Sequence, residues 1–354
     1  MRILVTGNEG YIGSILVPLL QAAGHHVTGL DTALFRECAL IPFTRPPTLR
    51  KDVRDVEAAD LSGLDAIIHL AGLANDPLGD LDPPLTYEIN HAATVRLAEL
   101  AKQVGIHRFL YASTCSVYGA AGEDMIDENS PPNPITPYAH SKLLSERDLA
   151  RLADASFCPV FLRAATAYGV SPYLRFDLAL NNLVAWAFTP HRVFLKSDGT
   201  SWRPLVHIRD IAQGYRILLE APSALVCNQA FNIGATAENY RIRELAQLVE
   251  RGVPDSRLEY ADDASPDHRS YRVNCDRIAN TLPAFKPQWN AERGIREVYE
   301  TLLGKGLNTE AFEGPRYNRI AHVRHLLRQG RLQPDLRWAQ PEPAEELATV
   351  GAMA

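Results

Sequence analysis

The stretch RILVTGNEGYIGSILVPLLQAAGHHVTGLD, residues 2–31, decides the fold of this chain. An apolar, β-rich run (2–6) leads at once into a glycine-rich turn, and the residues after the turn (14–23) have the pattern of a helix. A second strand (26–30) follows and ends on Asp31. Strand, glycine turn, helix, strand and acid form the βαβ unit that holds a pyrophosphate at a helix N-terminus. The stretch therefore predicts a dinucleotide site.

The turn carries three glycines, Gly7, Gly10 and Gly13, with Tyr11 and Ile12 between the last two. One glycine permits the tight turn, one lets the backbone approach the phosphates, and one lets helix and strand pack closely. A glycine pattern alone is weak evidence, and a turn without a ligand is the alternative. The flanking strand, helix and acid supply the context that the dinucleotide interpretation requires.

Asp31 indicates which dinucleotide binds. An acid at the end of the second strand accepts hydrogen bonds from the ribose hydroxyls and repels a 2′-phosphate, so we expect NAD rather than NADP. A solvated turn aspartate is the alternative, and Arg36 lies close enough in sequence to keep NADP open.

Composition narrows the functional classes. The chain has 354 residues and a formal net charge of -6, which argues against a nucleic-acid surface. No apolar run is long enough to span a membrane, and the first strand begins at residue 2, where a signal peptide would have to stand. The five cysteines are scattered without a CxxC pair, and the histidines have no metal-ligand spacing. We expect a cytoplasmic protein without a metal site or a membrane or nucleic-acid partner.

Strands and helices continue to alternate beyond residue 31, which predicts an α/β fold with a doubly wound parallel sheet of the Rossmann type. The expected strands are 49–53, 66–70, 108–113 and 160–165, and the expected helices are 85–105 and 136–153.

The regular alternation ends near residue 170. We expect an NAD-binding domain at 1–170, with a return of the chain to it at about 203–222. A smaller α/β substrate-binding domain is expected at 171–340. The Pro-, Glu- and Ala-rich end, 341–354, is expected to be a flexible tail.

Tyr138 and Lys142 stand four residues apart on the expected helix 136–153 and therefore share a face. A cationic lysine near the phenol, with a positive nicotinamide ring, would favour the phenolate. Such a tyrosine can take a proton from a sugar hydroxyl while hydride leaves. Thr114 ends a strand at the edge that faces the ligand crevice, where it can bond the same hydroxyl. Because YxxxK alone is a common accident, the prediction depends on the dinucleotide motif before it.

With these motifs the chain resembles the extended short-chain dehydrogenase/reductase family, in its nucleotide-sugar epimerase and dehydratase branch. The resemblance covers about residues 1 to 300. The matching motifs are TGxxGxxG at 6–13, Asp31, Asp52-Val53, HLAG at 69–72, Asn90, Ser113-Thr114, Val117-Tyr118-Gly119, Tyr138 with Lys142, Leu162-Arg163, Tyr168-Gly169, NNL at 181–183, and Arg203 before VHIRD at 206–210.

The resemblance implies roles for further residues on the cofactor side. Asp52 would reach the adenine amino group, and Val53 would lie against the ring. Leu70, Ala71 and Gly72 belong to the segment that lines the pyrophosphate and the nicotinamide ribose. Asn90 would support the cofactor side of the site, and Lys142 would hold the nicotinamide ribose.

The resemblance also implies a substrate side. Asn182 and Leu183 would hold the diphosphate of a nucleoside diphosphate sugar, and Arg203 would pair with a phosphate. Arg269 or Arg272 would be a further arginine on the phosphates. The sequence does not decide between the two, and Arg269 is taken as the candidate. Two helices near 85–105 and 136–154 commonly form a dimeric four-helix bundle in this family, which implies a homodimer.

Departures from the family pattern narrow the chemistry. The dehydratases of this branch carry two acids directly after the active-site threonine, whereas this chain has Cys115 and Ser116. Cys115 is expected to be a small packing residue rather than a proton-transfer thiol, and Ser116 is a candidate substrate contact. Small residues at 164–167 replace the family's aromatic and amide residues. The acids in 76–82 could contact sugar hydroxyls or an amine, or form a solvated loop.

Without an acid pair for elimination, we expect an NAD-dependent epimerase that acts through a transient keto-sugar. The alternative is an enzyme with net redox change, either a keto-sugar reductase or a nucleotide-sugar dehydrogenase. A non-catalytic NAD-binding regulator is a third possibility, but it would have no use for the threonine, tyrosine and lysine.

Overall fold

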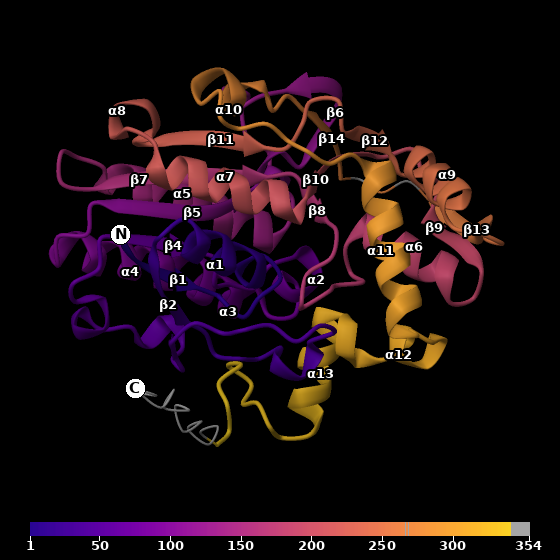
Figure 1. The fold of residues 1–354 in the computed structure, drawn as a ribbon, viewed down its shortest axis with the longest axis horizontal. Helices are drawn as coiled ribbons and strands as arrows, with labels where there is room; N and C mark the ends of the chain where they lie inside the picture. Colours follow the sequence, from indigo (N-terminus) through magenta and orange to yellow (C-terminus); the bar gives the residue numbers. More distant parts are fainter. Residues whose placement is uncertain (266, 268, 341–354) are drawn as a thin grey trace, which may run out of the picture.

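The computed structural model describes residues 1–265, 267 and 269–340 (Figure 1). The expectation of a flexible tail at 341–354 lies outside the described residues.

A seven-stranded parallel sheet forms the larger part of the molecule, with the strand order β11-β7-β5-β4-β1-β2-β3. The strands are β1 (Arg2–Thr6), β2 (His26–Leu30), β3 (Thr48–Leu49), β4 (Ala66–His69), β5 (Arg108–Thr114), β7 (Cys158–Ala164) and β11 (Gln229–Ile233). The chain reverses direction of winding between β1 and β4, which is where an open α/β sheet forms its ligand crevice. The predicted doubly wound parallel sheet is confirmed.

Apolar residues on both faces of the sheet explain why helices cover both sides. Ile3 and Val5 of β1 are buried in one core with Leu16 of α1. Leu4, which points the opposite way, is buried in a second core with Leu97 of α4. The helices associated with this sheet are α1 (Gly13–Ala22), α4 (Ala93–Gln103), α5 (Pro137–Leu152), α7 (Ile208–Glu220) and the short α8 (Ser223–Val226).

The second part of the chain gathers beside the sheet, around α6 and α9 (Figure 1). Its strands are β6 (Ala120–Ile126), β8 (Thr166–Tyr168), β9 (Arg192–Ser197), β10 (Trp202–His207), β12 (Asn239–Arg241), β13 (Arg257–Ser265) and β14 (Ser270–Val273). They pair as β12-β10-β8, β13-β9 and β14-β6. The remaining helices are α2 (Asp76–Gly79), α3 (Pro83–Tyr87), α6 (Ala179–Phe188), α9 (Ile242–Gly252), α10 (Asp276–Thr281), α11 (Ala291–Lys305), α12 (Thr309–Glu313) and α13 (Arg319–Arg328).

The helix expected at 85–105 is three elements instead of one. It consists of α3, a π-helical turn (Glu88–Ala92) and α4. The turn carries Asn90, whose side chain bonds both backbone groups of Leu73 in the loop after β4. A wider helical turn at a functional site is a recurrent way to place one side chain.

Two segments lie elsewhere than the sequence indicated. Beyond the expected return at about 203–222, the chain also supplies β11, which pairs with β7 at the edge of the large sheet. Residues 318–338, which fall within the range expected for the smaller domain, pack against α2 and the segment around α3 through a separate apolar cluster. Both differences arise from contacts between segments far apart in the sequence, which local pattern does not encode.

No helix among the described residues has the length and apolar character needed to cross a membrane. Across the same residues, no group of three or more His, Cys, Asp or Glu side chains is placed to hold a metal ion.

Candidate active site

A cavity of about 930 Å³ lies at the carboxyl edge of the parallel strands and continues to β9 and β10 of the second part. It collects the candidate site residues named above, except Asn90 and the alternative Arg272. These lining candidates are Gly7, Gly10, Tyr11, Ile12, Gly13, Asp31, Asp52, Val53, Leu70, Ala71, Gly72, Thr114, Ser116, Tyr138, Lys142, Asn182, Leu183, Arg203 and Arg269.

The glycines of the turn bring its backbone close to the cavity. Gly7 has φ 71°, and a Cβ there would lie 2.9 Å from the Ala71 amide nitrogen. A Cβ on Gly13 would lie 2.3 Å from the carbonyl oxygen of Gly7. No side chain caps the start of α1. The Ser14 and Ile15 N–H groups donate to the Gly10 and Ile12 carbonyls, whereas the N–H groups of Ile12 and Gly13 have no partner among the described residues and can bind an anion. The turn therefore fits a pyrophosphate.

Asp31 lines the cavity at the end of β2. Its carboxylate accepts hydrogen bonds from the backbone N–H groups of Glu9 at 2.9 Å and Ala33 at 2.8 Å. Burial raises the pKa of this carboxyl above its ordinary value. Arg36, which kept NADP open, is not among the lining residues. The acid is thus held at the position where a ribose hydroxyl would meet it.

The remaining cofactor-side candidates differ in their contacts with the rest of the protein. Asp52 caps the turn that follows it and forms an ion pair of 2.8 Å with Arg54, while Val53 is buried beside the cavity. Asn90 does not touch the cavity but fixes its wall. Its Oδ1 accepts a hydrogen bond of 2.7 Å from the Leu73 N–H. It therefore positions the loop that contains Gly72.

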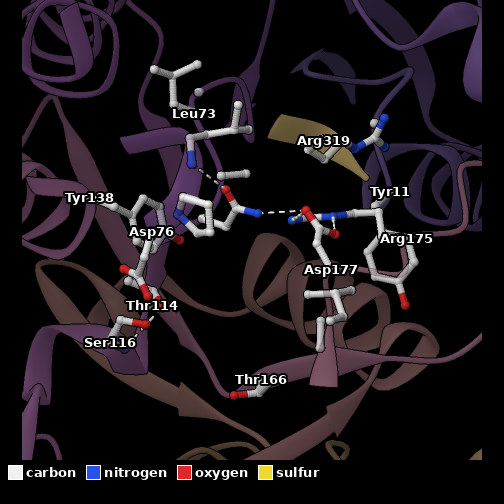
Figure 2. A pocket seen from close by; sticks show the side chains of 18 of the residues that line it. Tyr11, Leu73, Asp76, Thr114, Ser116, Tyr138, Thr166, Arg175, Asp177 and Arg319 are labelled. Atoms are coloured by element: carbon white, nitrogen blue, oxygen red, sulfur yellow. Dashed lines mark hydrogen bonds and ion pairs between the residues drawn. The ribbon is translucent and has the colours of Figure 1, made fainter. Parts of the chain in front are cut away.

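Thr114, Tyr138 and Lys142 meet at the centre of the site. Thr114 ends β5, and its hydroxyl oxygen accepts a hydrogen bond of 3.1 Å from the Ser116 N–H. Tyr138 lies in the first turn of α5, which Thr136 caps with its hydroxyl. Lys142, one turn later, donates from Nζ to the Ala112 carbonyl at 2.9 Å. Figure 2 shows Thr114, Ser116 and Tyr138 together on one side of the cavity.

The electrostatics of these groups differ from the sequence-based expectation in one respect. Burial raises the pKa of the Tyr138 phenol, and the hydrogen bond from Thr114 opposes that rise. Burial also lowers the pKa of Lys142 to about 8. The lysine Nζ lies 6.0 Å from the centre of the Tyr138 ring. The chain alone therefore holds the phenol protonated, and the phenolate requires further positive charge.

Two arginines expected to bind phosphate stand in a row of alternating charges. Arg203 forms a 2.7 Å ion pair with Asp267. Asp267 also pairs with Arg269 at 2.8 Å, and Arg269 reaches Asp76 at 2.7 Å. Arg272 points elsewhere, with its guanidinium over the Trp202 ring. Of the two alternatives left open above, Arg269 is the one at the cavity.

Cys115 and Ser116 occupy the positions where the dehydratases carry acids. Cys115 is 1 % exposed, and its thiol contacts the Arg163 carbonyl at 3.2 Å. Burial raises the pKa of this thiol well above its ordinary value, as a packing residue requires. The Ser116 hydroxyl faces the cavity, 3.4 Å from the hydroxyl of Tyr271.

The motifs did not indicate several charged lining residues, among them Arg175, Asp177 and Arg319. Arg175 and Asp177 pair at 2.8 Å, and Asn75 donates to the same carboxylate at 2.7 Å. The RxD spacing at 175–177 in an irregular segment is a weak signal for such a pair. Arg319 gave no signal because it lies beyond the region of resemblance.

Comparisons with known proteins agree with this geometry. Residues 3–234 match the NAD dependent epimerase/dehydratase family. The chain is 30 % identical over 322 residues to a UDP-glucose 4-epimerase of Mycolicibacterium smegmatis, covering 86 % of this chain and 99 % of that one. It is 28 % identical over 329 residues to a UDP-glucose 4-epimerase of Neisseria meningitidis serogroup B, covering 84 % and 95 %.

Solved structures show the same fold. The structure of MoeE5 in complex with UDP-glucuronic acid and NAD superposes with a TM-score of 0.73 at 26 % identity, covering 87 % of this chain and 100 % of that one. The NAD-dependent NDP-hexosamine 5,6-dehydratase TunA gives a TM-score of 0.75 at 25 % identity, covering 86 % and 98 %.

The close-packed glycines of the turn, the start of α1 without a side-chain cap and the hydrogen-bonded Asp31 all fit NAD, the cofactor of the matched family. The match covers well over half of the chain and runs from β1 to β11. The resemblance drawn from the motifs is confirmed: this protein belongs to the NAD-dependent epimerase/dehydratase family, in the extended short-chain dehydrogenase/reductase fold.

Proposed function

We propose that the protein is an NAD-dependent epimerase that inverts C4 of the sugar in a nucleoside diphosphate sugar. The observation that carries the proposal is the meeting of Thr114, Tyr138 and Lys142 beside a dinucleotide turn, with no carboxylate at positions 115 and 116. The relatives named UDP-glucose 4-epimerases favour this activity over a net redox reaction, and they favour uridine as the base.

Tyr138 acts as the base and then as the acid of the reaction. Its phenolate takes the proton of the C4 hydroxyl, and Thr114 holds that hydroxyl in line. Bound NAD⁺ supplies the acceptor that stores the hydride between the two half-reactions. Lys142, as a cation on the same face of α5, favours the phenolate and holds the nicotinamide ribose. Tyr138 then returns its proton to the oxygen of the inverted carbon.

The wall of the sugar end has room for the keto-sugar to turn. Ala164, Ala165, Thr166 and Ala167 all line the cavity, and none has a side chain larger than threonine. For the configuration to invert, the keto-sugar must present its opposite face to the group that returns the hydride. Small side chains at the end of β7 and the start of β8 permit that rotation, whereas elimination would need a nearby acid that Cys115 and Ser116 do not provide.

The test is a panel of sugar nucleotides with a catalytic amount of NAD⁺, followed by mass spectrometry and proton NMR. We expect an isomer of unchanged mass and no steady change in NADH absorbance. A substrate deuterated at C4, turned over in ordinary water, should keep its deuterium through many turnovers, because the hydride returns internally. Stoichiometric NADH consumption or release would instead establish the reductase or dehydrogenase, and loss of a water mass would establish a dehydratase.

We also propose a cytoplasmic homodimer. The cysteine composition supports the compartment, since all five thiols are free in the structure. The neighbouring helices α4 and α5 support the assembly, because they lie side by side on one face of the sheet and could pair with their copies as a four-helix bundle. Light scattering on the purified protein should give twice the mass of 39.2 kDa.

A further inference from the structure

The segment 318–338, called here the C-terminal arm, crosses the molecule and packs beside the dinucleotide end of the cavity. It holds the loop after β2 through a bond of 2.6 Å from Trp338 Nε1 to the Thr32 carbonyl. The ring of His322 contacts the Leu34 carbonyl at 2.9 Å. The arm also receives a bond from Arg54 on the carbonyl of Asp335 at 3.0 Å. Figure 1 shows α13 on the β2 side of the sheet.

An apolar cluster joins the arm to the segment that follows β4. Val323 and Leu326 of α13, with Leu332 and Leu336, are buried together with the leucines and isoleucine of 73–89. The arm is therefore fixed both to the loop that follows Asp31 and to the segment that follows Gly72. Asn318, Arg319 and Leu336 of the arm line the cavity itself.

Arg319 is the unusual member of the arm. It is 5 % exposed, and its guanidinium forms no hydrogen bond or ion pair among the described residues. Its guanidinium stacks on the Phe35 ring, 3.8 Å from the ring centre. Burial and the like charge of Arg175 lower the pKa of Arg319 to about 10. Burying a cation whose neighbouring carboxylates are bonded to other groups is costly, so the site favours an anionic ligand.

The acids near Arg319 already have partners. Asp177 is paired with Arg175 and also accepts from Asn75. Asp31 accepts from two backbone N–H groups. Arg319 also stands at the start of α13, a ten-residue helix whose N-terminus adds partial positive charge.

The position of Arg319 indicates which phosphate group it would bind, that of the dinucleotide or that of the sugar nucleotide. Phe35 follows Asp31 in the loop that borders the adenosine ribose, and Figure 2 shows Arg319 across the cavity from Tyr138 and Thr114. The arginines suited to the substrate's diphosphate, Arg203 and Arg269, belong to the second part of the chain. We propose that Arg319 binds the pyrophosphate of NAD and that the C-terminal arm thereby clasps the cofactor.

The proposal rests on the cofactor and not on the epimerase reaction, so it is tested by binding alone. The variant is Arg319→Gln, and its matched control is Arg324→Gln, an exposed arginine on the same helix with the same loss of charge. Calorimetric titrations of NAD-free protein use four probes: NAD⁺, ADP, adenosine and UDP. Circular dichroism and thermal melting verify that both variants fold.

We expect Arg319→Gln to raise the dissociation constants of NAD⁺ and ADP by about 10- to 100-fold, the usual range for loss of a charge-assisted contact. Adenosine and UDP should bind as they do to the wild type, and Arg324→Gln should change none of the four affinities. Natively purified Arg319→Gln should also lose NAD that the wild type retains. Arg319→Lys, which keeps the charge without the planar fork, should fall between the two.

Unchanged ADP and NAD⁺ affinity in Arg319→Gln would overturn the proposal. An equal loss for adenosine would show that the arginine only packs the nucleoside loop, and a loss for UDP alone would assign it to the substrate. If Arg319→Gln does not fold, Arg319→Lys decides by the same comparison of ADP with adenosine.

Discussion

Tyr138 is the residue on which the proposed chemistry depends. A phenylalanine in its place would remove the hydroxyl and keep the packing of the ring. Tyr138→Phe should leave the fold and NAD binding intact while lowering kcat by about 10²- to 10⁴-fold, the usual contribution of general acid–base catalysis. Tyr271→Phe is the control, because that buried phenol lines the same cavity and its hydroxyl lies 3.4 Å from the hydroxyl of Ser116. Activity of Tyr138→Phe within a few-fold of the wild type would remove it from the mechanism.

The burial of Lys142 lowers the free energy of unfolding of the protein. Its pKa is about 8 in the folded chain against 10.5 for a free side chain, so between these values the unfolded chain binds more protons and the free energy of unfolding rises with pH. The lysine thus destabilises the fold most below pH 8. Lys142→Met should abolish turnover and remove this pH dependence.

The measurement is urea unfolding of wild type and Lys142→Met at pH 7 and pH 10. The difference between their unfolding free energies should change by roughly 2 to 3 kcal/mol over that interval, in the direction that favours the wild type at pH 10. A difference that stays constant with pH would contradict the shifted pKa.

Asp31 should make the protein prefer NAD⁺ over NADP⁺. A 2′-phosphate would meet a buried carboxylate that two backbone N–H groups hold in place. Titration of both cofactors checks this, and Asp31→Asn should narrow the difference between them. Tighter binding of NADP⁺ by the wild type would show that the acid does not face the ribose.

At the scale of elements, the π-helical turn between α3 and α4 is where one side chain supports a whole wall of the site. The sequence predicted one continuous helix because its apolar periodicity hardly changes across one inserted residue. Asn90 determines the break, since it bonds Leu73 in the loop after β4 and Ser141 in α5. The local sequence pattern does not show that the Asn90 side chain bonds a distant loop, so it could not predict the break in the helix.

Asn90→Ala should therefore lower the free energy of unfolding by about 1 to 3 kcal/mol, because buried backbone groups of Leu73 lose their partner. It should also weaken NAD⁺ binding, since the loop carries Gly72 into the cavity. Glu99→Ala, an exposed change on the adjoining α4, is the control and should leave both quantities within error. Equal effects of the two substitutions would mean that the turn is not what fixes the loop.

For the whole molecule, the parts predicted from sequence are those written in short, contiguous motifs. The glycine turn, Asp31 and the Tyr138–Lys142 pair each combine neighbours along the chain, and the fold and cofactor followed from them. Arg319 could not be found this way, because its role depends on where α13 packs. The choice between Arg269 and Arg272 likewise required knowing which guanidinium points to the cavity.

The arm has a consequence for how the protein is made. Trp338 bonds Thr32 across 306 residues, and His322 bonds Leu34 across 288. Contacts of such sequence separation are the slowest to form, since a long loop must close first. A chain still on the ribosome can assemble the sheet early but cannot finish the adenosine pocket until residue 338 has emerged. On the proposed role of the arm, stable cofactor binding is one of the last events of biosynthesis. We expect a chain whose translation stops before the arm to fold its sheet but to release the cofactor more readily.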